Sequence, residues 1–390
     1  MKTHSLILQG VLFGLFGLVG CTAKSPNKPI VEDYTERGKQ LAKEGKITAS
    51  VVSFNRGISL EPTNPAPYIG LAVLYESLNR SDLAVETLEQ LQAVSPTAKG
   101  LSCRLAEAYL GAEDLTSARA WSEKAAKEGE DMVRTHSVYG IVMLRFRYWD
   151  TALEQLTQAW KLAPDDKELP LLIMDVHLQK GDYDKATQLG ETLLTQFETS
   201  PQLQYKLGWG YARQPLKQDV AKKAERHLRR AFELSPQWFE PYAELGRLYK
   251  SLARNEDALH SFEQAWKLNK AVPGVMFNLS VLWRQKGDKR AIEVETAFHN
   301  RMKEQEKFTA LRRDYNSPLS KDFESNVIDL ARREGKSQMY GTALHRLRKL
   351  LSKNPENVEA LKLYVLYDQQ ARSGYESYLR PGPGISAPGF

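Results

Sequence analysis

Cysteine and histidine are the side chains best suited to nucleophilic or metal chemistry, and this chain of 390 residues has two cysteines and seven histidines. Six of the histidines are scattered along the chain without the spacing that brings metal ligands or catalytic bases together: His136, His177, His227, His260, His299 and His345. The sequence contains no HExxH, CxxC, GxxxxGK[ST] or GxSxG pattern. It therefore predicts no enzyme, metal site or cofactor.

The two cysteines, Cys21 and Cys103, lie in different settings. Cys103 is in a helical stretch, LSCRLAEAYL, where a small, partly buried thiol is expected rather than a reactive one. Cys21 ends an uncharged apolar run from Ser5 to Gly20 that Lys2 precedes, the architecture of a secretory signal. The run is short and interrupted by glycine, which favours cleavage over a membrane span. Without Cys21 no intrachain disulfide is possible, so stability must come from packing.

The segment Leu18-Val19-Gly20-Cys21 resembles the lipobox of bacterial lipoproteins. The resemblance implies that the chain is cut before Cys21 and that the Cys21 thiol is acylated, for example with palmitate, as the first residue of the mature protein. Thr22 follows in place of the aspartate that retains many such proteins in the inner membrane. An outer-membrane anchor with the rest of the chain facing the periplasm is then expected. The alternative is an ordinary signal peptide with a chance cysteine.

The composition excludes two broad classes. Charged residues make up 26% of the chain and hydrophobic ones 42%, enough to build a core, so wholesale disorder is excluded. The net charge is only +6, because 54 basic and 48 acidic residues are interspersed. A dedicated nucleic-acid binder is therefore not expected.

The clearest pattern is an internal repeat of 34 residues, marked by Pro62, Pro96 and Pro164, which lie one and two periods apart. Small and large apolar residues recur between these prolines: Tyr68, Leu71, Ala72, Tyr75, Ala84 and Leu88 in one unit, and Tyr139, Gly140, Met143, Ala152, Leu156 and Ala159 in another. The pattern resembles the tetratricopeptide repeat, whose signature is W-x2-L-G-x2-Y, A-x3-F and P. The resemblance implies an all-α solenoid, a right-handed superhelix of antiparallel helix pairs.

The units differ in quality. The one from about Lys167 to Glu198 is degenerate, but Ala186 and the GDYDKA turn keep its register. After Gly287-Asp288, the segment from Arg290 to Tyr315 reads as one long charged helix rather than half of a repeat.

These features divide the chain into six segments. The expected divisions are a signal peptide (1–20), a linker (21–30), an array of about seven to eight repeats (31–288), a long charged helix and connector (289–320), a final repeat with a capping helix (321–372) and a disordered tail rich in proline and glycine (373–390).

In tetratricopeptide arrays the first helix of each pair lines a concave groove. The resemblance places apolar residues there in the early units: Ile69, Val73, Leu110, Ile141, Leu144, Leu171 and Leu178. In the later units it places aromatic and basic residues there: Tyr205, Trp209, Arg213, Arg247, Lys250, Phe277 and Arg284, with Lys206 and Asn278 beside them. The hypothesis is that the later half holds an acidic peptide. The alternative is that the arginines only solvate this face while Trp209 packs on a neighbouring helix.

An anchored repeat array resembles the outer-membrane lipoproteins that assist assembly of type IV or Tad-like pili and secretins. This resemblance implies a scaffold that binds other envelope proteins through its groove, with a membrane contact through lipid and with no nucleic-acid or small-molecule substrate. Two other roles remain open. One is an adaptor that regulates peptidoglycan hydrolases or other cell-wall enzymes, and the other is a component of exopolysaccharide export.

Overall fold

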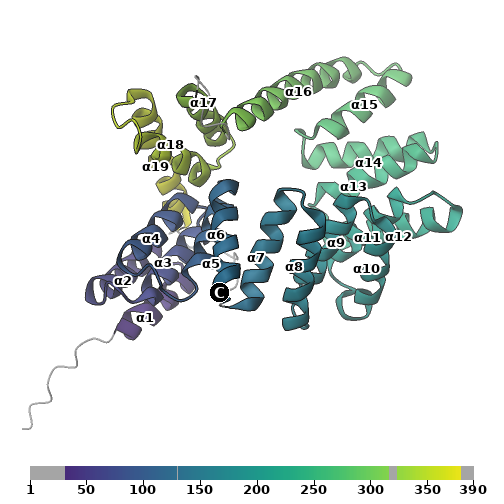
Figure 1. The fold of residues 1–390 in the computed structure, drawn as a ribbon. Helices are drawn as coiled ribbons and strands as arrows, with labels where there is room; N and C mark the ends of the chain where they lie inside the picture. Colours follow the sequence, from purple (N-terminus) through teal and green to yellow (C-terminus); the bar gives the residue numbers. More distant parts are fainter. Residues whose placement is uncertain (1–30, 130, 316–322, 379–390) are drawn as a thin grey trace, which may run out of the picture.

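The computed structural model describes residues 31–129, 131–315 and 323–378, and it places helices α1 to α19 there with no strand (Figure 1). The predicted all-α repeat fold is confirmed for this part of the chain. The predicted signal peptide and linker lie outside the described residues.

Helices α1 to α14 form seven antiparallel pairs, in which each helix packs on the next. The pairs are α1 (Val31–Lys43) with α2 (Ile47–Leu60), α3 (Pro65–Ser77) with α4 (Ser81–Val94), α5 (Leu101–Gly111) with α6 (Leu115–Glu128), α7 (Met132–Arg145) with α8 (Trp149–Leu162), α9 (Leu169–Lys180) with α10 (Tyr183–Phe197), α11 (Pro201–Arg213) with α12 (Gln218–Leu234), and α13 (Phe239–Ser251) with α14 (Asn255–Leu268). The degenerate unit from about Lys167 to Glu198 is thus a complete hairpin, α9–α10.

Glycines lie where the two helices of a pair approach most closely. A Cβ added to Gly246 of α13 would come within 2.7 Å of the Phe262 ring of α14, and one added to Gly140 of α7 within 2.7 Å of the Leu156 side chain of α8. Phe262 and Leu156 are fully buried. In these repeats a glycine on one helix therefore faces a large side chain on its partner, so that the layers interdigitate.

The turn inside most hairpins contains one residue in the left-handed conformation. The sequence predicts turns between paired helices at Gly181 and Gly287, and both residues have positive φ, 92° and 70°. Other hairpins place a residue with a side chain there: Asn79, Glu113, Arg147, Ala253 and Gln338. Glycine content alone therefore identifies only some of the turns, because the short connection imposes the left-handed conformation on whatever residue is present.

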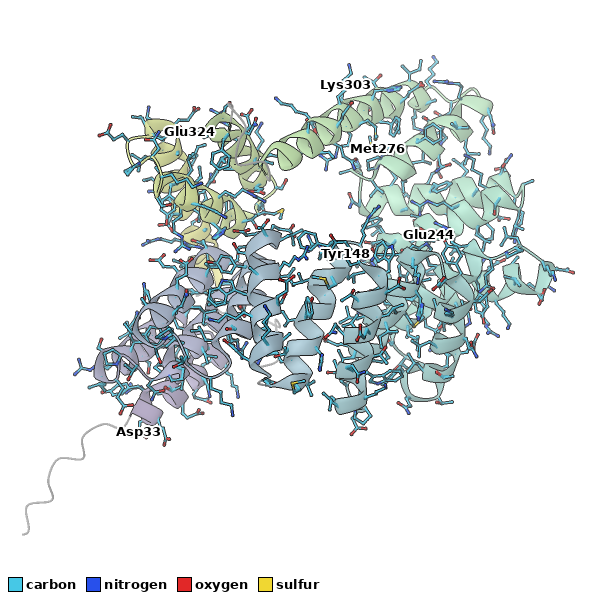
Figure 2. All side chains as sticks on the ribbon, viewed as in Figure 1. Asp33, Tyr148, Glu244, Met276, Lys303 and Glu324 are labelled. Carbon is cyan, nitrogen blue, oxygen red and sulfur yellow. The ribbon has the colours of Figure 1, made fainter. Side chains whose placement is uncertain are left out.

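The C-terminal part departs from the regular array. Helix α15 (Pro273–Gln285) pairs with α16 (Arg290–Tyr315), a helix of 26 residues that crosses from α15 to the C-terminal unit in Figure 1. The helix matches the segment in which the sequence predicts a long charged helix. Ala291 and Val294 near its start are buried, whereas the middle is exposed, as Figure 2 shows at Lys303.

The C-terminal unit consists of α17 (Phe323–Lys336), α18 (Tyr340–Leu351) and α19 (Val358–Tyr378). Helix α19 packs on α18, as a capping helix should. It continues to Tyr378, so the tail predicted to begin at residue 373 was placed too early. The reason is that no proline occurs between Ser373 and Pro381, so these residues can extend the helix. Residues 379–390 of the predicted tail lie outside the described part.

The C-terminal unit also contacts the second and third helix pairs, so the array closes on itself. Helix α18 packs on α4, and Arg348 of α18 forms an ion pair of 3.0 Å with Glu89 of α4. Lys349 lies 2.8 Å from Asp114, the residue that caps α6. Gly341 faces the turn before α4, where an added Cβ would lie 2.2 Å from the carbonyl oxygen of Asn79. The C-terminal unit is therefore more than a cap at a free end of the stack, because it also binds the second and third helix pairs.

Candidate functional site

The odd-numbered helices form the inner layer of the array. From α1 to α13, each odd-numbered helix contacts the next odd-numbered one as well as its own partner. Side chains on their free faces therefore share one continuous surface, which we call the inner face. The predicted groove residues Tyr205, Trp209 and Arg213 lie on α11, Arg247 and Lys250 on α13, and Phe277 and Arg284 on α15.

Three aromatic rings lie together where α11 meets the start of α13. The Tyr205 ring stacks on Trp209 at 6.3 Å between centroids and packs at 4.7 Å on Trp238, the residue before α13. Burial raises the pKa of the Tyr205 hydroxyl, and the charges of Glu244 and Glu240 raise it further. The indole nitrogen of Trp209 is buried without a hydrogen-bond partner. Trp209 thus packs within this cluster, as the alternative interpretation of the sequence expects, and it also carries an unused donor.

Glu244 joins the two central arginines of the predicted site. This carboxylate, labelled in Figure 2, is 5% exposed; it lies 3.0 Å from Arg213 and accepts a hydrogen bond from Arg247. Sequence reasoning did not single out Glu244. The pairing fixes both guanidinium groups in place and neutralises part of their charge. Each arginine side chain remains about one-third exposed, 33% for Arg213 and 34% for Arg247. Each guanidinium also has N–H donors on more than one side.

A second group lies between α13 and α15. Lys250 donates a 2.7 Å hydrogen bond to Asn278, and its ammonium lies 5.7 Å from the centre of the Phe277 ring. Phe277 is 47% exposed although one edge contacts Phe298 of α16 at 5.6 Å between centroids. An exposed ring beside a cation offers an apolar contact to a partner.

The remaining predicted residues are engaged elsewhere. Lys206 pairs with Asp175 of α9, and Arg284 pairs with Glu295 of α16. The structure therefore groups Tyr205, Trp209, Arg213 and Arg247 through Glu244, and Lys250, Phe277 and Asn278 beside them, while Lys206 and Arg284 belong to neighbouring ion pairs.

The early half of the inner face is less apolar than the sequence predicts. Leu144 and Leu178 are buried at 9% and 2% exposure, so they belong to the core rather than to the surface. Charged residues take part in the surface instead: Arg104 and Arg134 both pair with Glu107, at 3.2 and 2.6 Å. The signal was present, because Arg104 and Glu107 lie one helical turn apart on the same face as Leu110.

Glu76 of α3 belongs to the same charged group. Burial, reinforced by the charge of Glu107, raises the pKa of this carboxyl to about 7, although Arg104 and Arg134 oppose the rise. Cys103, near Glu107 and Arg134, is 2% exposed, and burial raises the pKa of its thiol to about 12. A thiol in such surroundings is unreactive.

No cluster of three or more histidine, cysteine or acidic side chains suited to a metal ion occurs among residues 31–129, 131–315 and 323–378. Within the same ranges, no helix is both long and apolar enough to cross a bilayer.

The repeats match known family models at three places. Residues 69–132, 149–209 and 239–271 each match a model described as tetratricopeptide repeat. These hairpins are tetratricopeptide repeats. The prediction from the 34-residue period is confirmed, and tetratricopeptide repeats imply a protein-binding scaffold, because stacked pairs present an extended concave surface.

Proteins similar to this chain are also described as tetratricopeptide repeat proteins. The tetratricopeptide repeat and J domain-containing co-chaperone DNJ1 of Cryptococcus neoformans var. grubii is 23% identical over 195 residues, which are 47% of this chain and 37% of that protein. The chain thus spans little more than a third of this curated relative. A tetratricopeptide repeat protein from Parabacteroides merdae is 14% identical, with a TM-score of 0.50, over 65% of this chain and 98% of its own. YrrB, described as a repeat protein with an unusual peptide-binding site, is 21% identical, with a TM-score of 0.39, over 48% of this chain and 95% of its own.

Proposed function

We propose that this chain is a scaffold anchored in the outer membrane of a bacterium, where it holds a partner protein during assembly of an envelope machine, a type IV or Tad-like pilus or a secretion system. The tetratricopeptide repeats support the scaffold, and the Leu18–Cys21 segment supports the anchor. Cys21 lies outside the described residues, so its acylation rests on the sequence.

The observation that carries the binding part of this proposal is the surface around Glu244. Two guanidinium groups are held there by one buried carboxylate, with the Tyr205 and Trp209 rings on one side. Held guanidinium groups lose little side-chain entropy when a ligand binds. A carboxylate of the partner can accept from the N–H groups that Glu244 leaves free, in charge-assisted hydrogen bonds.

Phe277 supplies the apolar contact of the same surface. Its exposed ring and the Lys250 ammonium lie on the next odd-numbered helices along the inner face. A partner segment that pairs an acidic residue with an apolar one fits both groups at once. An extended or helical acidic peptide with an apolar anchor is therefore the proposed ligand.

The binding test uses Arg213→Gln combined with Phe277→Ser in the mature lipoprotein, crosslinked in its native envelope before purification. Charge reversal at Arg213 is avoided because it would place a second carboxylate against buried Glu244. We expect the partner recovered with the wild type to be lost. Tyr148→Ser is the matched control, since Tyr148 is a half-exposed aromatic residue, at 48%, in the turn before α8. Full recovery with a folded double variant would reject the site.

The anchor has a separate test. Metabolic labelling with palmitate should mark the wild type, and Cys21→Ser should abolish the label and release the protein from the membrane fraction. An unlabelled wild type would reject the anchor and leave the partner-binding surface untouched.

A further inference from the structure

The C-terminal unit and the early repeats each have a hydrophobic core of their own. Among the described residues, the buried apolar cluster of the C-terminal unit draws only on α17, α18 and α19. The buried cluster of the early repeats extends from α3 to α9 and includes no described residue of that unit. The two parts can therefore separate without opening either core, as folded domains joined by a polar interface do.

Ion pairs with opposite signs on the two sides make much of the contact between these parts. Arg348 of α18 lies 3.6 Å from Glu86 and 3.0 Å from Glu89, both on α4. Lys349 of α18 lies 2.8 Å from Asp114, the residue before α6. In these pairs α18 supplies the cations and the early repeats supply the carboxylates, so the two surfaces attract each other.

The remaining charged groups at the contact keep this complementarity. Asp368 of α19 pairs with Arg80 in the reverse sense, and His345 of α18 lies 3.4 Å from Asp114 and edge-on to the Tyr109 ring. On the early side the carboxylates outnumber the cation; they are Asp82, Glu86, Glu89 and Asp114, with Arg80. On the C-terminal side the cations outnumber the carboxylate; they are Arg348, Lys349 and Arg372, with Asp368.

Arg80, Asp114 and Asp368 each have a partner on their own side as well. Arg80 donates two hydrogen bonds to Asp82, at 2.8 and 2.7 Å. Asp368 pairs with Arg372 at 2.8 Å, and Asp114 accepts from a backbone N–H in the first turn of α6. These three groups therefore keep a partner when the two parts separate, so no buried charge is left uncompensated among them.

The ion pairs that α18 makes across the contact are open to solvent. Lys349 is 41% exposed and Arg348 25%, and their partners Glu86 and Glu89 are 42% and 40% exposed. An exposed pair of this kind favours an association by up to about fivefold. Its strength depends on salt, because the Debye length falls from about 30 Å at about 0.01 M to about 3 Å at about 1 M.

We propose that the C-terminal unit is a reversible electrostatic latch. At low ionic strength it docks on the second and third helix pairs and closes the array. When the ion pairs are screened, it leaves as a folded unit. Its release uncovers Glu86, Glu89 and Asp114, which then form an acidic surface on the early repeats. The latch works through α18 and α19 and needs no ligand at the surface around Glu244.

The test measures the radius of gyration of the full-length protein by small-angle scattering at about 0.01 M and about 1 M salt. We expect the wild type to expand at high salt. Arg348→Glu should be expanded already at low salt, because it places a third carboxylate beside Glu86 and Glu89. Adding Glu86→Arg and Glu89→Arg should restore the compact form at low salt and its expansion at high salt.

The matched control is Arg230→Glu on α12. Arg230 also pairs with a glutamate of α12, at 3.4 Å, and is 43% exposed, but it lies outside the contact with the C-terminal unit. This variant should behave like the wild type at both salt concentrations. Circular dichroism should give the same helix content for all variants, because the unit undocks without unfolding.

Three outcomes would overturn the proposal. A wild-type radius of gyration that is equal at both salt concentrations would show that closure is permanent. An expanded Arg348→Glu that the two added arginines do not restore would assign the effect to packing rather than to charge. A loss of helix content on expansion would show that the C-terminal unit unfolds. No partner takes part in these measurements, so a failure of the proposed function leaves their result unchanged.

Discussion

The guanidinium of Arg80 lies 2.8 Å from the carboxylate of Asp368, although 288 residues separate the two in the chain. Arg80 also forms two hydrogen bonds with Asp82, and its side chain is only 3% exposed. The contact between the C-terminal unit and the early repeats is thus built around a buried charge that both sides help to satisfy. Loss of either carboxylate would leave Arg80 less completely paired.

The contact between the C-terminal unit and the early repeats can be tested at Gly341, where α18 meets the turn before α4. A methyl group at this position would overlap the carbonyl oxygen of Asn79 at 2.2 Å, and backbone atoms must move apart to admit it. We expect Gly341→Ala to separate the C-terminal unit from the early repeats, with helix content unchanged. Small-angle scattering should then give a larger radius of gyration. Gly111→Ala is the control, because the nearest atom to its added Cβ is at 3.7 Å. Identical scattering from both variants would show that the contact tolerates the change.

Glu76 should make stability fall as the pH rises. Its folded pKa is about 7, mainly through burial, against 4.5 for the free side chain. Between these values the folded state binds more protons than the unfolded state, so the free energy of unfolding decreases from pH 4.5 to pH 7, by at most about 3 kcal/mol. Denaturant unfolding at pH 5 and pH 7.5 should show a smaller difference for Glu76→Gln than for the wild type. An equal difference in the two proteins would refute this role.

His227 should act in the opposite direction. Burial, followed by the charge of Arg226, lowers the pKa of this imidazole to about 4, and Nδ1 lies 2.8 Å from the side-chain oxygen of Gln204. Between pH 6.5 and pH 4 the unfolded state binds more protons, so this site loses stability as the pH falls. An NMR titration should place the midpoint of the His227 ring near pH 4. A midpoint near 6.5 would contradict its burial as the neutral form.

The left-handed turns predict a stabilising change. Ala253 has φ of 58° and is exposed, a conformation that costs an L-residue about 1–2 kcal/mol. Ala253→Gly should relieve this strain and, after the entropy that glycine loses on folding, raise stability by about 0.5–1 kcal/mol. The matched opposite change is Gly287→Ala. Nothing lies within 4 Å of the added Cβ there, so only the backbone conformation should change the stability. Thermal unfolding of both variants should shift the midpoint in opposite directions.

The repeats were predictable because their determinants are local. Gly246 and Phe262 lie in one hairpin, and Gly140 and Leu156 have the equivalent positions in another. Because each such pair lies within one 34-residue unit, the pattern can be recognised in the sequence. Closure of the array was not predictable in this way. Arg80 and Asp368 occur once each, and neither differs in type from the many charged residues that face solvent on helices. A contact between distant, non-repeated charges leaves no periodic signal.

For the candidate residues, the helix was predictable but the pairing was not. The family pattern predicts Arg213 and Arg247 on the first helices of their pairs, and these helices are α11 and α13. It does not reveal that buried Glu244 binds both, because the partner is set by the side-chain directions of two helices that are adjacent only in the folded array. For the same reason the family pattern predicts Leu144 on the surface, whereas its side chain is buried in the core.

The ion pair between Arg80 and Asp368 also bears on how the array comes apart. In a linear repeat protein each unit contacts only its neighbours, so the terminal units have one contact fewer and fray first. Here the C-terminal unit and the second and third pairs protect each other. The first pair, α1–α2, keeps a free side, whereas the C-terminal unit does not. In the C-terminal half, amide protons should therefore exchange earliest in the exposed middle of α16 rather than at the last unit.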